Sequence, residues 1–313
     1  MYYFIVNDHG GSGRAAGTWN TVQNLLNERQ TAYKVYMTAA AGDATRIARE
    51  LTQLPDPEIP IVVVGGDGTI NEVLNGIADF SRVRFGLIPT GSGNDFARGL
   101  GIPRSTEKAL RLLLESDASR RIDIGRVTDC GDGATVTGAN SRLFAISSGM
   151  GMDAIVCKRA LTSRTKKVLN ALGLGGLTYK ILTVLTLARM KTEDVTVTFD
   201  GAETVRFSSL IFLAAMNMKA EGGGVPMAPR AEPDDGQLTL FAAHDIPKWR
   251  ALLDLLLLIS NKHEHIKGVF WKDFKSVRIT AAEPQILHTD GEYGGDMTDV
   301  LIECVPAQLR MLV

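Results

Sequence analysis

The 313-residue sequence has few cysteines and no long apolar run, and both absences narrow the class of protein. Its three cysteines, Cys130, Cys157 and Cys304, are too few and too scattered for a disulfide framework or a zinc site, and they favour a reducing compartment. No segment reaches the ~18 uninterrupted apolar residues that a transmembrane helix requires. The first residues, 1–6, lack the basic region and the length of a signal peptide. We therefore expect a cytoplasmic protein without a transmembrane segment.

An excess of charge of one sign is also lacking. The formal net charge is −1, which argues against a general nucleic-acid-binding protein. Hydrophobic residues make up 45% of the chain and charged residues 22%, a balance typical of a globular protein. A chain of this length predicts two domains or one large one.

Two common nucleotide-binding motifs are missing, the Walker loop and Gly-x-Gly-x-x-Gly. In their place, the β-branched run 59–64 leads into Gly65-Gly66-Asp67-Gly68-Thr69-Ile70-Asn71. We interpret this as a buried parallel strand, a glycine turn that permits close backbone approach or a positive φ, and a helix whose N-terminal N–H groups favour phosphate. Asp67 would repel phosphate unless a divalent cation or a water network lay between them. The segment therefore indicates nucleotide and metal chemistry.

Two other predicted strands run into glycine-rich loops. Strand 85–89 precedes Thr90-Gly91-Ser92-Gly93-Asn94-Asp95, and strand 2–7 precedes Gly10-Gly11-Ser12-Gly13. Parallel strands gather such loops along one carboxyl edge of a sheet, where open α/β sheets bind ligands. Any one loop alone would more often be a plain turn between a strand and a helix. Three together, with Asp67 and Asp95 among them, favour a ligand site.

The pattern of strands and helices changes near Arg121. Before it, strands alternate with helices over 13–29, 43–53 and 105–115, which predicts a doubly wound N-terminal α/β domain over 1–122, with 305–313 as an optional last strand. After it, short alternating runs predict a C-terminal, mostly antiparallel β-sandwich domain over 123–304, with inserted helices at 154–190 and 247–261. The predicted strands of this second part are 122–127, 143–147, 195–199, 208–216, 238–242, 277–281, 300–304 and 309–313.

The stretch 154–192 has eight basic residues and no Asp or Glu. One interpretation is an amphipathic helix that packs on the core with its basic face in solvent. The other is a surface that docks on anionic lipid headgroups. The run 252–259 is similarly apolar, but Asp254 interrupts it, and there we expect core packing.

Polar clusters also occur in the second part of the chain. Gly222-Gly223-Gly224 is followed by Asp234-Asp235-Gly236-Gln237-Leu238, and strand 285–288 by Asp290-Gly291-Glu292. Each cluster alone is most often a turn. In this order, and with the earlier loops, they resemble the bacterial diacylglycerol kinase-like lipid kinases, relatives of sphingosine kinases and, more distantly, of NAD kinases. The resemblance covers nearly the whole chain, and 89–98 is among its most specific segments.

That resemblance implies an ATP site built around the first loop. The residues that it implies for nucleotide binding lie in loops after predicted strands and are Asn7, Gly11, Thr38, Gly65, Gly66, Asp67, Gly68, Thr69, Ile70, Asn71, Ser92 and Asn94. The chain departs from the family in two places. Asn7-Asp8 stands where Asn-Pro is usual, which adds negative charge near the phosphates, and Glu221 stands where a smaller or aromatic residue is expected.

The resemblance also implies two Mg²⁺ sites. Asp67, Asp95 and Asp123 would organise the catalytic Mg²⁺ and its waters. A separate structural Mg²⁺ site would combine one carboxylate with two backbone carbonyls, from Asp235, Glu232 and Gln237 respectively.

The resemblance places the general base at Asp290 or Glu292, and the choice between them stays open; with Asp67 these are the predicted catalytic residues. Phosphoryl transfer requires positioned phosphates, a divalent metal and a base near the attacking hydroxyl. A carboxylate in a water-poor cleft can have a raised pKa and accept that proton. With the nucleotide in one domain and the base in the other, the active site is expected in the cleft between them.

We therefore predict an ATP- and Mg²⁺-dependent lipid kinase that transfers the γ-phosphate to a lipid hydroxyl, with diacylglycerol as the default acceptor. Its lipid substrate would lie in an anionic membrane, with which the protein would associate transiently at the surface. Whether the protein forms a homodimer is left open. The alternatives are an NAD kinase-like enzyme with a soluble acceptor and a non-catalytic nucleotide- or lipid-binding regulator. The segments 94–98 and 222–238 favour a lipid over NAD, and the intact acids argue against a regulator.

Overall fold

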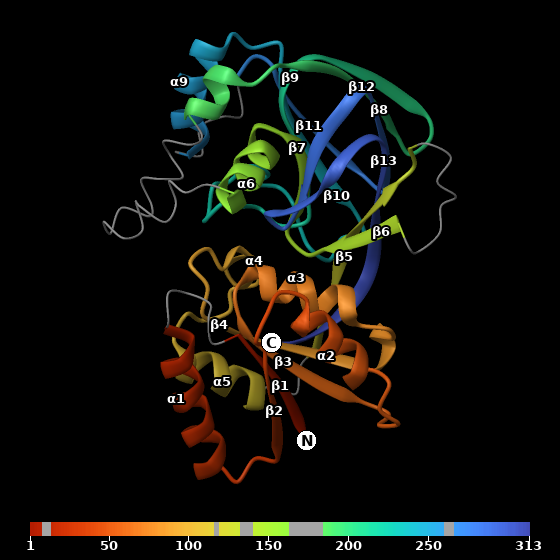
Figure 1. Ribbon diagram of the computed structural model, residues 1–313. Helices are drawn as coiled ribbons and strands as arrows, with labels where there is room; N and C mark the ends of the chain where they lie inside the picture. Colours follow the sequence, from red (N-terminus) through yellow and green to blue (C-terminus); the bar gives the residue numbers. More distant parts are fainter. Residues whose placement is uncertain (8–13, 116–118, 132–139, 163–183, 260–265) are drawn as a thin grey trace.

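The computed structural model describes residues 1–7, 14–115, 119–131, 140–162, 184–259 and 266–313. Within them, an N-terminal α/β body and a C-terminal β-rich body are stacked one above the other (Figure 1). The predicted fold class is confirmed. In the part of the chain that the structure describes, no helix is long and apolar enough to cross a membrane.

The N-terminal body is built on four parallel strands in the order β4-β3-β1-β2. These strands are β1 (Tyr2–Val6), β2 (Tyr33–Met37), β3 (Ile59–Gly65) and β4 (Val83–Pro89). The helical elements are α1 (Arg14–Glu28), α2 (Asp43–Leu51), α3 (Asp67–Gly76), η2 (Phe80–Arg82), α4 (Asp95–Gly99) and α5 (Thr106–Glu115). Because α1 and α5 pack together on one side of the sheet and α2 and α3 on the other, β3 is almost fully buried, which explains its continuous apolar run.

The C-terminal body consists of antiparallel strands with two named helices. The strands are β5 (Ser119–Asp129), β6 (Ser141–Phe144), β7 (Ser147–Gly151), β8 (Glu193–Phe199), β9 (Glu203–Met216), β10 (Leu238–His244), β11 (Val269–Phe274), β12 (Ser276–Thr289) and β13 (Glu292–Leu312). The helices are α6 (Met152–Thr162) and α9 (Lys248–Ile259). A large apolar cluster fills the interior of this body, with Phe199, Phe207 and Phe274 almost fully buried.

Strand β13 joins the two bodies. It pairs antiparallel with β12 and β5, and near its end Met311 pairs in parallel with Phe85 of β4. The predicted strands 300–304 and 309–313 are therefore one strand. The predicted boundary after residue 122 falls inside β5, so the division into domains at that residue stays a prediction.

Three other expectations differ from the described structure in whole or in part. The predicted strand 143–147 is two strands, β6 and β7, and β11 was not predicted. The predicted helix 154–190 begins as α6 and is helical again over 184–189, but 163–183 lie outside the described residues. Core packing of 252–259 is wrong for three leucines, since Leu252, Leu253 and Leu257 are exposed.

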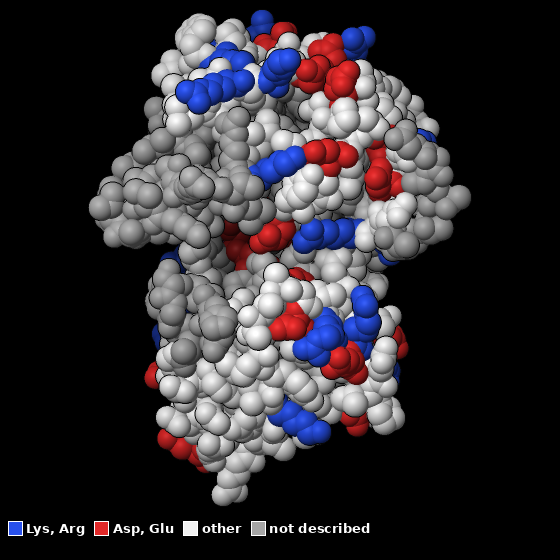
Figure 2. All heavy atoms as spheres, viewed as in Figure 1, with Lys and Arg blue, Asp and Glu red and all other residues white. Residues whose placement is uncertain are grey.

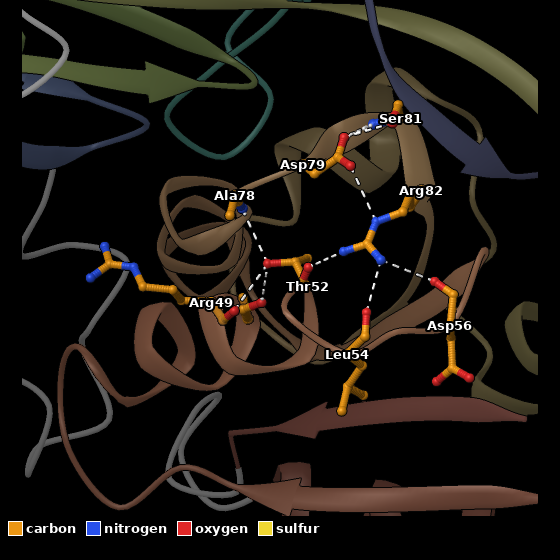
Figure 3. Close-up of polar contacts among 9 residues, drawn as sticks. Arg49, Thr52, Leu54, Asp56, Ala78, Asp79, Ser81 and Arg82 are labelled. Carbon is orange, nitrogen blue, oxygen red and sulfur yellow. Dashed lines mark hydrogen bonds and ion pairs between the residues drawn. The ribbon is translucent and has the colours of Figure 1, made fainter.

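A single guanidinium fixes the connection between α2 and β3 (Figure 3). Arg82 donates to the carbonyl oxygens of Leu54 (2.8 Å), Asp56 (3.2 Å) and Thr52, and its Nε pairs with Asp79 at 3.1 Å. The carbonyl groups just beyond a helix have no helical partner, and a nearby cation both satisfies them and complements the helix dipole. The Arg82 side chain thereby ties η2 to the chain that leads into β3, and so to the strand that carries the first glycine loop.

Candidate active site

The first glycine loop follows β3 and opens directly into α3. Gly66 is the N-cap of α3 and, having no side chain, gives it no side-chain cap, so the first N–H groups of the helix are open to an anion. A Cβ atom on Gly65 would lie 2.8 Å from Thr69 Cβ, and one on Gly66 would lie 3.0 Å from Gly91 Cα. Since neither glycine has a positive φ, close packing and not a left-handed backbone explains both residues: Gly65 packs on Thr69 of α3, and Gly66 packs on the second glycine loop.

Asp67, the first residue of α3, holds the second glycine loop in place. Its two carboxylate oxygens accept the N–H groups of Asp95 (3.1 Å) and Phe96 (3.2 Å), at the start of α4. Burial, with the nearby charges of Asp95 and Asp290, raises the pKa of Asp67 to about 6. Three acids therefore converge here, and an added cation would relieve their repulsion.

Asp95 connects this loop to the C-terminal body. Its carboxylate pairs with Arg98 at 2.5 Å and accepts the N–H of Gly223 at 2.7 Å, from the glycine loop of the other body. Burial raises the pKa of Asp95, and the Arg98 charge opposes that shift. The two predicted glycine loops thus meet across the boundary between the bodies.

The Asp290-Gly291-Glu292 segment is the tight turn between β12 and β13, with positive φ at Asp290 and Gly291. The Asp290 side chain is buried, and its oxygens accept four N–H groups, from Ala145 (2.9 Å), Ile146 (2.7 Å), Ser147 (3.1 Å) and the Asn71 amide (2.8 Å). Burial raises the pKa of Asp290, and the hydrogen bonds oppose the shift. Asp290 is therefore fully engaged in holding the turn against β7 and α3.

Glu292 differs from Asp290 in its burial and in its contacts. It is half-buried, and its Oε1 lies 3.1 Å from the position of a Cβ on Gly68, in the first turn of α3. No hydrogen bond or ion pair joins its carboxylate to another residue in the described part of the chain. Of the two acids in the turn, Glu292 is thus the one with free oxygens beside the first glycine loop.

Asn71 links α3 to the C-terminal body. Besides Asp290, its amide nitrogen donates to Leu143 O at 3.0 Å, and its oxygen accepts from Arg142 at 2.7 Å. Arg142 also donates to Tyr293 O at 3.3 Å. These contacts fix the turn that carries Glu292 relative to the loop that carries Asp67.

One cavity lies at the carboxyl ends of β1, β2 and β3 and has a volume of about 350 Å³. Alanines, small polar side chains and one carboxylate line it, from Asn7, Thr38, Ala39, Ala40, Ala41, Ala44, Thr69 and Glu72. Asn7 donates to Thr69 Oγ1 at 3.0 Å, and the buried Thr38 hydroxyl lies 3.4 Å from Val6 O. Three predicted nucleotide-binding residues therefore share this cavity.

A second cavity, of about 180 Å³, lies in the C-terminal body beside the Asp290 turn. It is lined by Val127, Asn140, Ser141, Arg142, Leu287, Thr289, Gly294 and Met297. Thr289 is fully buried, its hydroxyl has no hydrogen-bond partner among the described residues, and it pairs directly with Glu292 across the hairpin. Directly opposed residues lie on the same face of a sheet, so Glu292 and this cavity share one face.

Three other predicted nucleotide-binding residues differ in their exposure and contacts. Ile70 is buried in the core, so only its backbone is available, whereas Ser92 is exposed. Asn94 has φ +51°, donates to Gly91 O at 2.8 Å, and has a buried oxygen without a partner in the described chain, as does the neighbouring Thr90 hydroxyl. Gly11 lies outside the described residues.

The contacts of Asp123 group it with Asp235. The buried Asp123 carboxylate accepts the N–H groups of Gly236 (2.7 Å) and Ala307 (2.6 Å), and its charge contributes to the raised pKa of Asp235, after burial. Asp235 is exposed and accepts the N–H of Gln237 at 2.9 Å. No hydrogen bond within the described ranges joins Asp123 to Asp67 or Asp95. The neighbouring Glu232 side chain pairs with Lys219 at 2.7 Å. The group of Glu232 that is expected to bind the structural Mg²⁺ is its backbone carbonyl, which this ion pair does not involve.

Sequence reasoning missed a buried cluster of Asp153, Glu221 and His288, whose polar atoms lie within 4.8 Å of one another. Burial opposes protonation of His288, but its contact with Asp153 prevails and raises the pKa of His288 to about 9. Burial raises the pKa of Glu221 to about 7, and Ser147 donates to it. The unusual Glu221 was the signal in the sequence. The cluster lies directly behind the turn, with His288 Nδ1 3.3 Å from Gly291 N.

Comparison with known proteins gives matches along the whole chain. The family model of the diacylglycerol kinase catalytic domain matches residues 1–127, and that of the YegS C-terminal NAD kinase beta sandwich-like domain matches residues 145–313. The chain is 33% identical to a diacylglycerol kinase of Staphylococcus carnosus, over 84% of this chain and 78% of that protein. It is 30% identical to a diacylglycerol kinase of Bacillus subtilis, over 91% of this chain and 88% of that protein.

Solved structures share the fold. A diacylglycerol kinase from Bacillus anthracis aligns over 100% of this chain and 96% of its own, with a TM-score of 0.69 and 20% identity. An NAD kinase from Archaeoglobus fulgidus in complex with ATP aligns over 100% of this chain and 94% of its own, with a TM-score of 0.52 and 15% identity.

Proposed function

The chain belongs to the diacylglycerol kinase family, and from that premise we propose that it is an ATP- and Mg²⁺-dependent lipid kinase with its active site between the two bodies. The observation that carries the proposal is the meeting of acids from both bodies at one edge of the parallel sheet. Asp67 and Asp95 come from the N-terminal loops, and Glu292 comes from the β12–β13 turn and lies against the first turn of α3. Diacylglycerol is the default acceptor because the relatives carry that name.

The residues present suit ATP. The alanines of the larger cavity offer an apolar wall for a base, and the open N–H groups of α3 suit its phosphates. Asn7, Thr38 and Thr69 lie between these two regions as polar contacts. The Thr90 hydroxyl and the Asn94 side-chain oxygen, which have no hydrogen-bond partner in the described chain, lie in the loop that packs on Gly66 and add polar atoms on the phosphate side.

The residues present also suit Mg²⁺, which when bound would neutralise charge that develops on the transferred phosphate. Asp67 and Asp95 supply carboxylate oxygens, the ligands that Mg²⁺ prefers, and each oxygen of Asp67 accepts only one N–H. Burial first, and then the charge of Asp95, raises the pKa of Asp67, and a cation between the two carboxylates would offset both effects. We place the second, structural Mg²⁺ at the Asp235 carboxylate, with Asp123 as its buried neighbour.

Glu292 is our choice as general base. Asp290 accepts four N–H groups, so its oxygens have little capacity left for the proton of an acceptor hydroxyl. Glu292 has free oxygens in the described structure and shares a face with the smaller cavity, which we assign to the part of the acceptor next to its hydroxyl. The acceptor would thus be held between that cavity and the first turn of α3.

A lipid acceptor requires the enzyme to reach a membrane, so we propose transient peripheral association with an anionic bilayer from the cytoplasm. A homodimer stays a prediction.

The proposal is tested with purified protein, γ-labelled ATP and Mg²⁺, and lipids presented in mixed micelles, with NAD as a soluble acceptor. We expect label in a lipid, loss of transfer in Glu292→Gln, and full transfer in Glu283→Gln, a matched exposed acid on β12. Label in NAD alone, or no transfer to any acceptor while ATP still binds, would overturn the proposal.

A further inference from the structure

The exposed apolar side chains of this protein are concentrated at one place. Ten large hydrophobic residues are exposed in the described chain, and six of them lie on α9 and on the helix 184–189. These six, which we call the α9 surface, are Val184 (40% exposed), Leu185 (42%), Trp249 (69%), Leu252 (38%), Leu253 (55%) and Leu257 (41%). A cluster of apolar side chains that are exposed to solvent marks an interaction site.

The two helices lie side by side, and each already has a buried face. Lys248 Nζ donates to Met190 O at 2.5 Å, and Leu187, Met190, Ala251 and Leu258 belong to or pack on the same apolar cluster. Figure 1 shows α9 next to the helix 184–189 at the outer edge of the C-terminal body. Core packing is thus provided by other residues of these helices, so it does not account for the α9 surface.

The exposed residues of α9 share one face of the helix. Trp249, Leu253 and Leu257 are spaced four residues apart, and Leu252 follows Trp249 by three. Residues three and four apart project from the same side of an α-helix. A tryptophan among leucines on such a face is typical of helices that lie in the membrane interface.

The charge around the α9 surface differs in sign from that of the whole chain. The described segments 184–191, 245–259 and 266–268 contain five basic residues and two acidic ones, a net charge of +3, whereas the whole chain has −1. One of the acids, Asp254, is mostly buried and lies 3.6 Å from Arg250. Lys and Arg atoms gather over α9 in Figure 2.

We propose that the α9 surface docks on a lipid bilayer with anionic headgroups and holds the kinase at the membrane that contains its acceptor. The inference rests on the proposed function and adds the surface by which that function reaches its substrate. The apolar side chains would enter the acyl boundary while the surrounding cations contact headgroup phosphates. A second copy of this chain suits the surface less well, because a two-fold contact would bring two patches of +3 against each other.

Sedimentation with vesicles tests the inference on the full chain. The vesicles contain phosphatidylcholine, either alone or with about one third phosphatidylglycerol. The double variant Trp249→Ser/Leu253→Ser should bind the anionic vesicles about 100-fold more weakly, since each exposed side chain contributes about tenfold when it enters the apolar phase. The matched control is Val35→Ser/Met37→Ser, which removes two exposed hydrophobic residues from β2 and should bind as the wild type does.

A second double variant separates the contribution of the basic residues to binding from that of the apolar residues. Arg189→Gln/Lys191→Gln should weaken binding to the anionic vesicles and leave binding to pure phosphatidylcholine unchanged, and added salt should reproduce the effect. Equal binding by the wild type and by Trp249→Ser/Leu253→Ser would overturn the inference. So would a wild-type dimer that this variant converts to a monomer without loss of vesicle binding.

A short-chain diacylglycerol, kept below its critical micelle concentration, tests the docking surface and the kinase activity separately. Trp249→Ser/Leu253→Ser should phosphorylate this dispersed acceptor at the wild-type rate while it loses activity on vesicles. If the wild type phosphorylates no lipid in either form yet binds anionic vesicles through the α9 surface, the proposed function fails and the docking surface stands.

Discussion

Replacement of Asp290 by asparagine should destabilise the protein, because the four groups that contact this side chain are all donors. One oxygen accepts from Ile146 and Ser147, and the other from Ala145 and Asn71. An amide has only one oxygen, so its NH₂ group would face two buried N–H groups whichever way it is turned. A buried donor without an acceptor costs about 1–3 kcal/mol, so Asp290→Asn should lower the free energy of unfolding by about 2–6 kcal/mol. That is a large part of the about 5–15 kcal/mol typical of a folded protein.

Replacement of Glu292 by glutamine should instead lower turnover and leave the stability of the fold nearly unchanged. Its carboxylate has no hydrogen bond to the described residues, so the free energy of unfolding should change by no more than about 0.5 kcal/mol. If Glu292 is the base, turnover should fall by about 10²–10⁴.

Urea unfolding followed by circular dichroism, together with turnover of both variants under identical conditions, distinguishes the two roles. If Asp290→Asn unfolds at the wild-type urea concentration and loses only turnover, Asp290 acts chemically and does not hold the turn in place, contrary to the role assigned to it. If Glu292→Gln keeps wild-type turnover, Glu292 is not the base.

Three other predictions concern pH and packing. Because the pKa of Asp67 is raised to about 6, activity should fall as the pH drops through about 6, and more Mg²⁺ should move this midpoint to lower pH by competing with the proton; rate profiles at two Mg²⁺ concentrations measure the shift. Because the pKa of His288 is raised from 6.5 to about 9, its pairing with Asp153 should stabilise the fold fully below pH 6.5 and be lost as the pH rises through about 9; urea midpoints across this window should fall in the wild type and stay flatter in His288→Asn. Gly125→Ala should destabilise by about 1–3 kcal/mol, since the new Cβ would overlap the Phe144 ring, and a wild-type thermal midpoint would contradict this.

Local patterns were sufficient for much of the N-terminal body. The predicted strand at 85–89 lies within β4, and the glycine loop after the run 59–64 opens into α3 as expected, because short apolar runs followed by glycine leave few other choices. The exposed leucines of α9 were predicted wrongly, since an apolar run does not say which of its faces meets the core.

The site depends more on long-range contacts, which one sequence does not contain. Asp290 and Glu292 are two residues apart and chemically alike. Their roles are separated by donors that are distant in sequence, the backbone N–H groups of 145–147 and the Asn71 amide, all of which contact Asp290. His288 and Asp153 are 135 residues apart, and their pairing arises from the position of α6 against β12. The grouping of Asp123 with Asp235 likewise follows from the course of β5 and not from any motif.

The path of β13 has a consequence for the order in which the chain folds. Strand β4 pairs with β3 on one side, and on the other side its pairing with β13, among the described residues, joins Phe85 to Met311. During synthesis, the β4 edge of the N-terminal sheet would therefore stay unpaired until Met311 had emerged from the ribosome. The edge of an apolar strand readily pairs with other chains while it is exposed. Contacts between residues as distant in sequence as Phe85 and Met311 also form slowly. Folding of the N-terminal body should thus be completed only once β13 has been synthesised, so truncation before β13 should yield an aggregating fragment and not a free nucleotide-binding domain.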